Sequence, residues 1–108
     1  MRGPDFIIIL STAASAEEAT KIAEQLVADR VVACVNILPG MQSVYWWKDS
    51  IQKESEVLMI MKTTKEKFSE VQRTIQSAHS YEVPEVISFS IEQGSEDYLK
   101  WLESSLLS

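Results

Sequence analysis

The sequence predicts an α+β fold in which helices cover one face of a single antiparallel sheet. Three observations lead to this prediction. The chain has 108 residues, which is the size of one ordinary domain. It contains only three Gly and three Pro and has no linker or low-complexity tract, so we expect one domain over residues 1–108. Short apolar runs typical of strands alternate with apolar patterns of helical period.

The first third of the chain predicts a strand, a helix and a second strand. Asp5 to Ser11 contains a continuous apolar run, which is typical of a strand in the middle of a sheet. Ser15-Ala16-Glu17-Glu18 is a capping box, and apolar residues recur after it at helical spacing as far as Asp29-Arg30. Val31 to Leu38 is rich in β-branched residues and predicts the second strand.

The second and third strands are predicted to form a long hairpin. Pro39-Gly40 is expected to interrupt the second strand as a bulge or bend, and Val44 to Trp47 resumes the extended pattern. Lys48-Asp49-Ser50 predicts a turn, and Glu56 to Lys62 predicts the third strand. If residues 31–47 are extended they reach about 55 Å at ~3.3 Å per residue, whereas a domain of this size has a radius of gyration of about 13 Å. The hairpin must therefore bend back over its own sheet or project beyond the domain.

The far end of this hairpin carries Tyr45, Trp46 and Trp47. A soluble monomer seldom leaves so large an aromatic area in water. We therefore expect the tip to pair with a neighbouring copy of the chain. The alternative is a hairpin that folds back over its own sheet.

The remaining elements complete the fold prediction. Thr63 to Glu66 reads as a second capping box, followed by a helix that ends near Ala78. Val86 to Ile91 predicts the last strand, and a short amphipathic helix begins near Ser95. The order βαββαβ plus a C-terminal helix is the split βαβ pattern of a ferredoxin-like sandwich.

Composition excludes several classes of function. The chain has 10 Lys+Arg against 16 Asp+Glu, a formal net charge of -6, so we expect no nucleic-acid partner. The apolar run Phe6-Ile7-Ile8-Ile9-Leu10 is too short to span a bilayer, so we expect no membrane partner. One Cys excludes an intrachain disulfide, and we expect a cytoplasmic location.

Cys34 and His79 are the main candidates for chemistry. Cys34 lies within the second predicted strand and is read as a buried core residue, a ligand or a nucleophile. His79 is the only His in the chain and follows the second predicted helix. It is read either as a residue that stabilises the helix end or, with the nearby carboxylates, as a ligand for copper or zinc. The sequence contains none of the short motifs of common enzymes, so we expect no catalytic activity.

Several short stretches together resemble one known family, the CutA divalent-cation tolerance proteins. The resemblance runs from the first strand to the last helix. Its residues are Ala33-Cys34-Val35-Asn36-Ile37 with Pro39-Gly40, Ser43-Val44-Tyr45, Lys48, Glu56 to Thr64, His79 with Tyr81-Glu82-Val83-Pro84-Glu85, and Tyr98-Leu99-Lys100-Trp101-Leu102.

The resemblance implies a homotrimer similar to the PII signalling proteins, a role in tolerance to divalent metals, and no established enzymatic activity. It implies that copper or another divalent cation is bound in clefts between subunits, with His79 facing the metal. The other residues expected to line this cleft are Cys34, Tyr45, Trp47, Lys62, Tyr81 and Glu82. The alternative function is that of a PII-like signalling module, which docks on a partner protein and binds metal only incidentally.

The chain departs from the family pattern at three places. Ser11 stands where some relatives have Cys, and Ala78-His79 stands where they have a His-His pair, so one thiolate and one imidazole are missing from their copper site. His79-Ser80-Tyr81 replaces the usual H-P-Y. Trp47-Lys48-Asp49 replaces W-x-G, although Asp49 can still take a left-handed turn conformation.

Overall fold

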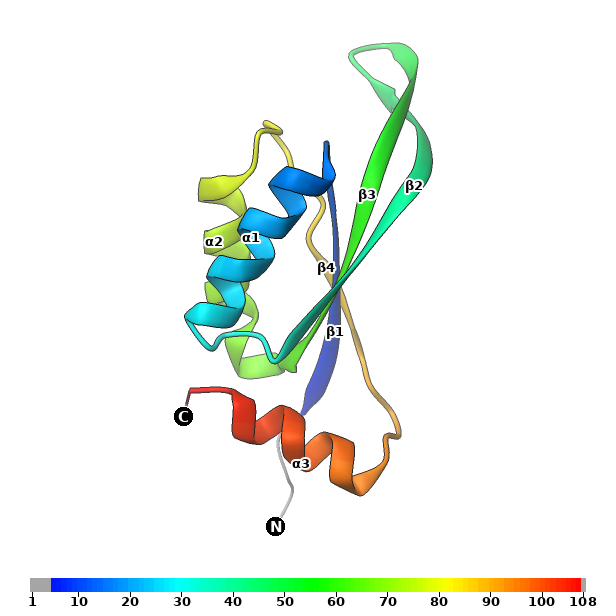
Figure 1. Cartoon of the computed structure of the whole chain (residues 1–108). Helices are drawn as coiled ribbons and strands as arrows, with labels where there is room; N and C mark the ends of the chain where they lie inside the picture. The colour runs from blue at the N-terminus through cyan, green and yellow to red at the C-terminus, as the bar shows by residue number, and fades with distance from the viewer. Residues whose placement is uncertain (1–4, 108) are drawn as a thin grey trace.

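The computed structural model describes residues 5–107 and confirms the predicted order of strands and helices (Figure 1). The helical and extended elements are β1 Phe6–Ala13, α1 Ala16–Ala28, β2 Cys34–Trp47, β3 Ser50–Thr64, the 3-10 helix η1 Lys65–Lys67, α2 Phe68–Ala78, β4 Ile87–Ser90 and α3 Glu96–Ser105.

The four strands form one antiparallel sheet in the order β2-β3-β1-β4. β1 and β2, which α1 connects, are separated by β3, as in a split βαβ unit. α1 and α2 lie side by side on one face of the sheet, and α3 crosses the end at which β1 begins (Figure 1). The predicted α+β, ferredoxin-like class is confirmed.

The core lies between the sheet and these two helices. Alternate residues of the central strands point into it, and Ile9 of β1 is paired with Met61 of β3, both fully buried. α1 begins as predicted, because the Ser15 Oγ accepts a hydrogen bond of 3.1 Å from the Glu18 N–H. The largest fully buried apolar side chains are Ile9, Ile22, Leu26, Met59, Met61, Ile75 and Leu102.

The hairpin of β2 and β3 projects beyond the helical layer, so that the molecule measures 50 × 26 × 23 Å (Figure 1). We call the part of this hairpin from Met41 to Glu56 the arm. A register shift between Leu38 and Met41, with Gly40 at φ 83°, confirms the predicted bulge. Lys48 and Asp49 both have positive φ, the geometry of a tight two-residue hairpin turn.

Two predictions were wrong, one about the start of the third strand and one about the residues that follow it. β3 begins at Ser50 rather than Glu56, because its polar first residues pair with β2 along the whole arm. Thr63-Thr64-Lys65-Glu66 is not a capping box. Thr63 and Thr64 end β3, and the Thr63 Oγ1 donates a hydrogen bond of 2.6 Å to the Val31 carbonyl.

Two strand ends also differ from the prediction. β2 begins at Cys34 rather than Val31, since Val31 and Val32 are buried core residues in the connection from α1. The last strand covers only Ile87–Ser90.

The sheet face opposite the helices is mostly apolar and is uncovered in the single chain. Leu10 of β1, Ile60 of β3 and Ile87 of β4 share one row across this face with Asn36 of β2. Ile8 and Phe89 share the next row with Lys62 and Cys34. Ile87 and Phe89 are about half exposed, at 52% and 50%. We call this surface the open face.

Candidate functional site

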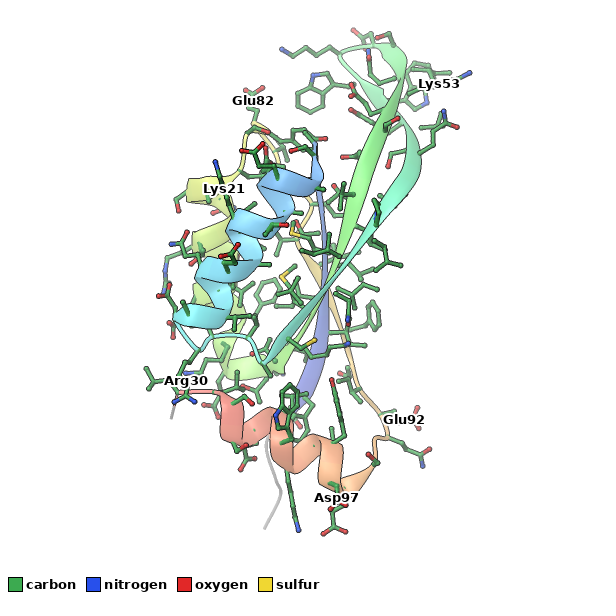
Figure 2. All side chains as sticks on the ribbon, viewed as in Figure 1. Lys21, Arg30, Lys53, Glu82, Glu92 and Asp97 are labelled. Atoms are coloured by element: carbon green, nitrogen blue, oxygen red, sulfur yellow. The ribbon has the colours of Figure 1, made fainter. Side chains whose placement is uncertain are left out.

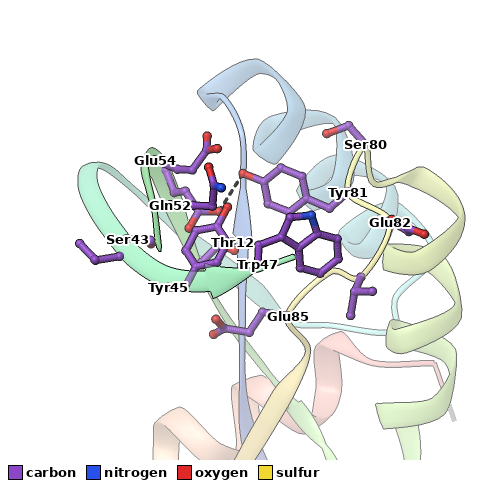
Figure 3. Close-up of a pocket in the computed structure, with 13 residues that line it drawn as sticks. Thr12, Ser43, Tyr45, Trp47, Gln52, Glu54, Ser80, Tyr81, Glu82 and Glu85 are labelled. Carbon is purple, nitrogen blue, oxygen red and sulfur yellow. Dashed lines mark hydrogen bonds between the residues drawn. The ribbon is translucent and has the colours of Figure 1, made fainter. Parts of the chain in front are cut away.

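A cavity of about 680 Å³ lies between the arm and the loop that connects α2 to β4 (Figure 3). Three aromatic side chains and four carboxylates line it, together with small polar and apolar groups. These residues are Tyr45, Trp47 and Tyr81; Glu54, Glu56, Glu82 and Glu85; and Thr12, Ser43, Val44, Gln52, Ser80 and Val83.

The register of the arm explains why these residues face one cavity. Tyr45 pairs with Gln52, Ser43 with Glu54, and Met41 with Glu56, so the partners project from the same side of the hairpin. Because side chains alternate along a strand, Glu54 and Glu56 are both on this side. The arm thus presents aromatic and acidic side chains to the loop.

Tyr81 connects the loop to the arm. Its hydroxyl donates a hydrogen bond of 2.8 Å to Oε2 of Glu56, whose residue surface is only 7% exposed. Burial, followed by this hydrogen bond and the negative charge of Glu56, raises the pKa of Tyr81 well above its ordinary value. Tyr81 is therefore a neutral hydrogen-bond donor at physiological pH.

His79 fastens the same loop to the sheet. Its side chain is fully buried, and its Nε2 lies 2.5 Å from the Thr12 carbonyl oxygen. The Tyr81 N–H donates a hydrogen bond of 2.9 Å to Nδ1, which assigns the neutral ring with its proton on Nε2. Oε1 of Glu18 lies 3.3 Å from Nδ1, and the His79 and Tyr81 rings are in contact with centroids 4.5 Å apart.

These contacts use both ring nitrogens of His79. A metal ion could bind the imidazole only by displacing the Thr12 carbonyl or the Tyr81 amide. Within residues 5–107, no group of three or more His, Cys, Asp or Glu side chains is placed to hold a metal ion. The metal-facing role of His79 remains a prediction, and its observed contacts are those of a structural residue.

The structure divides the predicted cleft residues into two groups. Tyr45, Trp47, Tyr81 and Glu82 line the cavity. The other two, Cys34 and Lys62, do not.

Cys34 and Lys62 are paired across β2 and β3 nearer the opposite end of the sheet. There the Lys62 ammonium donates a hydrogen bond to Oδ1 of Asn36, and the Cys34 thiol lies 3.9 Å from the same oxygen.

Cys34 is a free, half-buried thiol and is not a core residue, because its row of the sheet belongs to the open face. It also has no contact with His79. Lys62 is paired with Ile8, and His79 contacts Thr12, four residues further along β1 or about 13 Å at ~3.3 Å per residue. Within one chain, Cys34 and His79 are therefore too far apart to form a thiol–imidazole pair.

Of the positions that depart from the family pattern, Ser80 lines the cavity, whereas Ser11 and Ala78 lie outside it. Ser11 is fully buried, and its hydroxyl has no hydrogen-bond partner among the described residues. Ala78 is exposed at the end of α2.

Sequence reasoning missed Glu54, Glu56 and Glu85 as members of one site. It placed Glu56 at the start of a strand and gave Glu85 no place in the expected cleft. The available signal was the period-two spacing of Glu54 and Glu56, which continues that of the third strand. Recognising it required the full length of β3.

Comparison with known proteins gives a consistent result. The family model described as CutA1 divalent ion tolerance protein matches residues 7–105. The chain belongs to the CutA1 family. Among curated CutA proteins, that of Thermus thermophilus is 38% identical over 98 residues, or 91% of this chain and 95% of the relative. That of Archaeoglobus fulgidus is 40% identical over 102 residues, or 94% and 97%. Both are described as divalent-cation tolerance proteins.

Solved CutA structures share the fold closely. The CutA1 structure of Oryza sativa has a TM-score of 0.94 at 35% identity, covering 96% of this chain and 95% of its own. That of Thermus thermophilus has a TM-score of 0.91 at 37% identity, covering 94% and 98%. One CutA relative is described as chloroplastic and another as periplasmic. In the described part of this chain, no helix is long and apolar enough to cross a bilayer.

Proposed function

We propose that this CutA1 protein acts in tolerance to divalent cations as a cytoplasmic homotrimer, which binds copper or another divalent cation where its subunits meet. The proposed role is binding rather than catalysis, in agreement with the separation of Cys34 from His79. The open face is the observation that supports self-association most strongly.

The open face and the two edges of the sheet need a partner. Strands β2 and β4 are the outer strands, so each leaves one side of its backbone unpaired within the sheet. The half-exposed Ile87 and Phe89 and the 44% exposed Leu38 add apolar area to this surface. Copies of the same chain can cover both the face and the edges, and a closed ring of copies leaves no edge free.

The arm supports the same assembly. Trp46 pairs with Ile51 on the side of the arm away from the cavity, and these side chains are 71% and 59% exposed. A single chain does not cover them, because the arm projects beyond its helical layer (Figure 1). A neighbouring subunit can cover both side chains.

Metal binding is proposed at the junctions between subunits, because residues 5–107 of one chain do not bring enough metal ligands together. The described residues of one protomer provide no set of three metal ligands, although the chain carries 16 Asp and Glu. A cation site at a junction can take donors from two or more copies.

Two substitutions test this function. Ile60→Glu places a charge on the open face, and Val27→Glu places one on the exposed side of α1, where Val27 is 43% exposed. We expect Ile60→Glu to dissociate the protein and to abolish calorimetric binding of Cu²⁺ and Zn²⁺, with Val27→Glu unchanged in both. A wild type that binds neither metal contradicts the metal role. A fully assembled Ile60→Glu protein contradicts the assembly.

The exposed Trp46 also favours the second candidate function, a PII-like module that docks on a partner protein. Trp46→Glu separates the two uses of the tip. A lower molar mass assigns the tip to self-association, and an unchanged mass leaves it available for another protein.

A further inference from the structure

The charge inside the cavity has one sign. Of the described residues that line it, four are Glu and none is Lys, Arg or His. Glu56 is largely buried, and the only hydrogen bond that its carboxylate makes with described residues is the one from the neutral Tyr81 hydroxyl. Buried carboxylates ordinarily have a cationic partner, because an unpaired charge loses its hydration.

The surrounding carboxylates reinforce this negative potential. Partial burial and the Glu56 charge raise the pKa of Glu85. Desolvation, followed by the charges of Glu54 and Glu56, raises the pKa of Tyr45. Figure 3 shows the side chains of Glu54 and Glu85 on either side of Tyr45. A positive charge placed among them relieves their repulsion.

The walls of the cavity suit an organic cation better than a bare metal ion. Tyr45 and Tyr81 provide aromatic rings, and the faces of such rings attract ammonium and guanidinium groups. The Lys48 ammonium already lies 5.7 Å from the centre of the Trp47 ring, although Lys48 does not itself line the cavity. A volume of about 680 Å³ is in the range of pockets for small organic ligands and far exceeds that of one ion.

We propose that this cavity binds a small organic cation, an aliphatic amine or guanidine, whose charged group pairs with Glu56 and whose carbon chain packs on Tyr45. The Tyr81 hydroxyl holds one oxygen of the Glu56 carboxylate and leaves the other for the ligand. Tyr45 is 38% exposed as a residue, and its ring offers a surface to the ligand chain. This inference goes beyond the proposed metal role and requires only residues of one chain.

Calorimetric titration of the assembled protein with agmatine and with spermidine tests the proposal. The buffer contains a chelator, so that metal binding does not contribute, and 1,6-hexanediol serves as a neutral chain of similar length. We expect saturable binding of at least one amine and none of the diol. Added salt should weaken the binding, because it screens charge.

Matched variants locate the site. Glu56→Gln keeps an acceptor for the Tyr81 hydroxyl and should weaken amine binding by about tenfold or more, since a hydrogen bond to a charged group is lost. Tyr45→Leu should weaken it by about three- to tenfold, because the aromatic ring on which the carbon chain of the ligand packs is lost. Glu92→Gln removes the same charge at the other end of the molecule (Figure 2) and should have no effect. Unchanged molar mass and far-UV circular dichroism confirm that each variant is folded.

Three results overturn the proposal. The first is that neither amine binds. The second is that Glu92→Gln weakens binding as much as Glu56→Gln, because the effect is then one of general surface charge. The third is that Glu56→Gln and Tyr45→Leu both leave binding intact, because the amine then binds elsewhere. If Glu56→Gln fails to fold, Glu85→Gln on the exposed loop replaces it, with the same expected direction and the same contradicting result. Because the molar mass is measured separately, a failure of amine binding is distinguishable from a failure of assembly.

Discussion

His79→Ala is expected to destabilise the protein strongly, because the imidazole links the loop after α2 to β1. The substitution removes a hydrogen bond to the Thr12 carbonyl and one from the Tyr81 amide, each worth about 1 kcal/mol. It also empties the space of a fully buried side chain, which adds about 1 kcal/mol or more. The free energy of unfolding should fall by roughly 3 kcal/mol. With a urea m-value of about 1.5 kcal/mol/M, the unfolding midpoint falls by about 2 M.

Urea unfolding followed by circular dichroism measures this change, with both proteins at equal concentration because self-association affects apparent stability. Ser77→Ala is the matched control. Its exposed hydroxyl donates only to the Thr74 carbonyl, so its loss should cost less than about 0.5 kcal/mol. A His79→Ala midpoint equal to that of the wild type refutes the reasoning. A wild type that loses the same stability on addition of chelator also refutes it, because the imidazole then acts through a metal.

Three further predictions follow from buried or crowded groups. Ser11→Ala should stabilise the protein by about 1 kcal/mol in the same urea assay, because it removes a buried hydroxyl that has no partner within residues 5–107. A loss of stability would show that the hydroxyl is paired. Glu85→Gln should stabilise the protein more at pH 7 than at pH 4, because the raised pKa of Glu85 makes its charged form unfavourable in the folded state. An equal effect on stability at pH 7 and pH 4 would contradict this explanation. Stability should also decline as the pH rises above 10, since the unfolded chain releases the Tyr81 proton before the folded chain does. Tyr81→Phe should make the decline of stability with pH less steep. An unchanged decline would show that Tyr81 does not cause it.

Local sequence signals predicted most of the fold because they depend on neighbouring residues. The Ser15 cap and the apolar spacing that follows determined α1, and the reach of residues 31–47 predicted that the hairpin is too long for its own domain. The wrong assignment at Thr63 has a tertiary cause. Its hydroxyl donates to the Val31 carbonyl, 32 residues away, instead of capping a helix.

The candidate site was less predictable because strand register assembles it. Glu56 faces Tyr81 only because β3 extends along the whole arm and the loop is fixed by His79. The alternation of polar and apolar residues in this arm does not distinguish a projecting strand from a loop. The family resemblance grouped Cys34 and Lys62 with residues at the other end of the sheet in a cleft between subunits, and that cleft stays a prediction.

The molar mass of the protein in solution tests the central claim, self-association through the open face and the arm, most directly. Sedimentation equilibrium at micromolar concentration should give about three times the 12.2 kDa of one chain. A mass of 12.2 kDa would show that Ile87, Phe89 and Trp46 remain exposed in water, and would contradict the account.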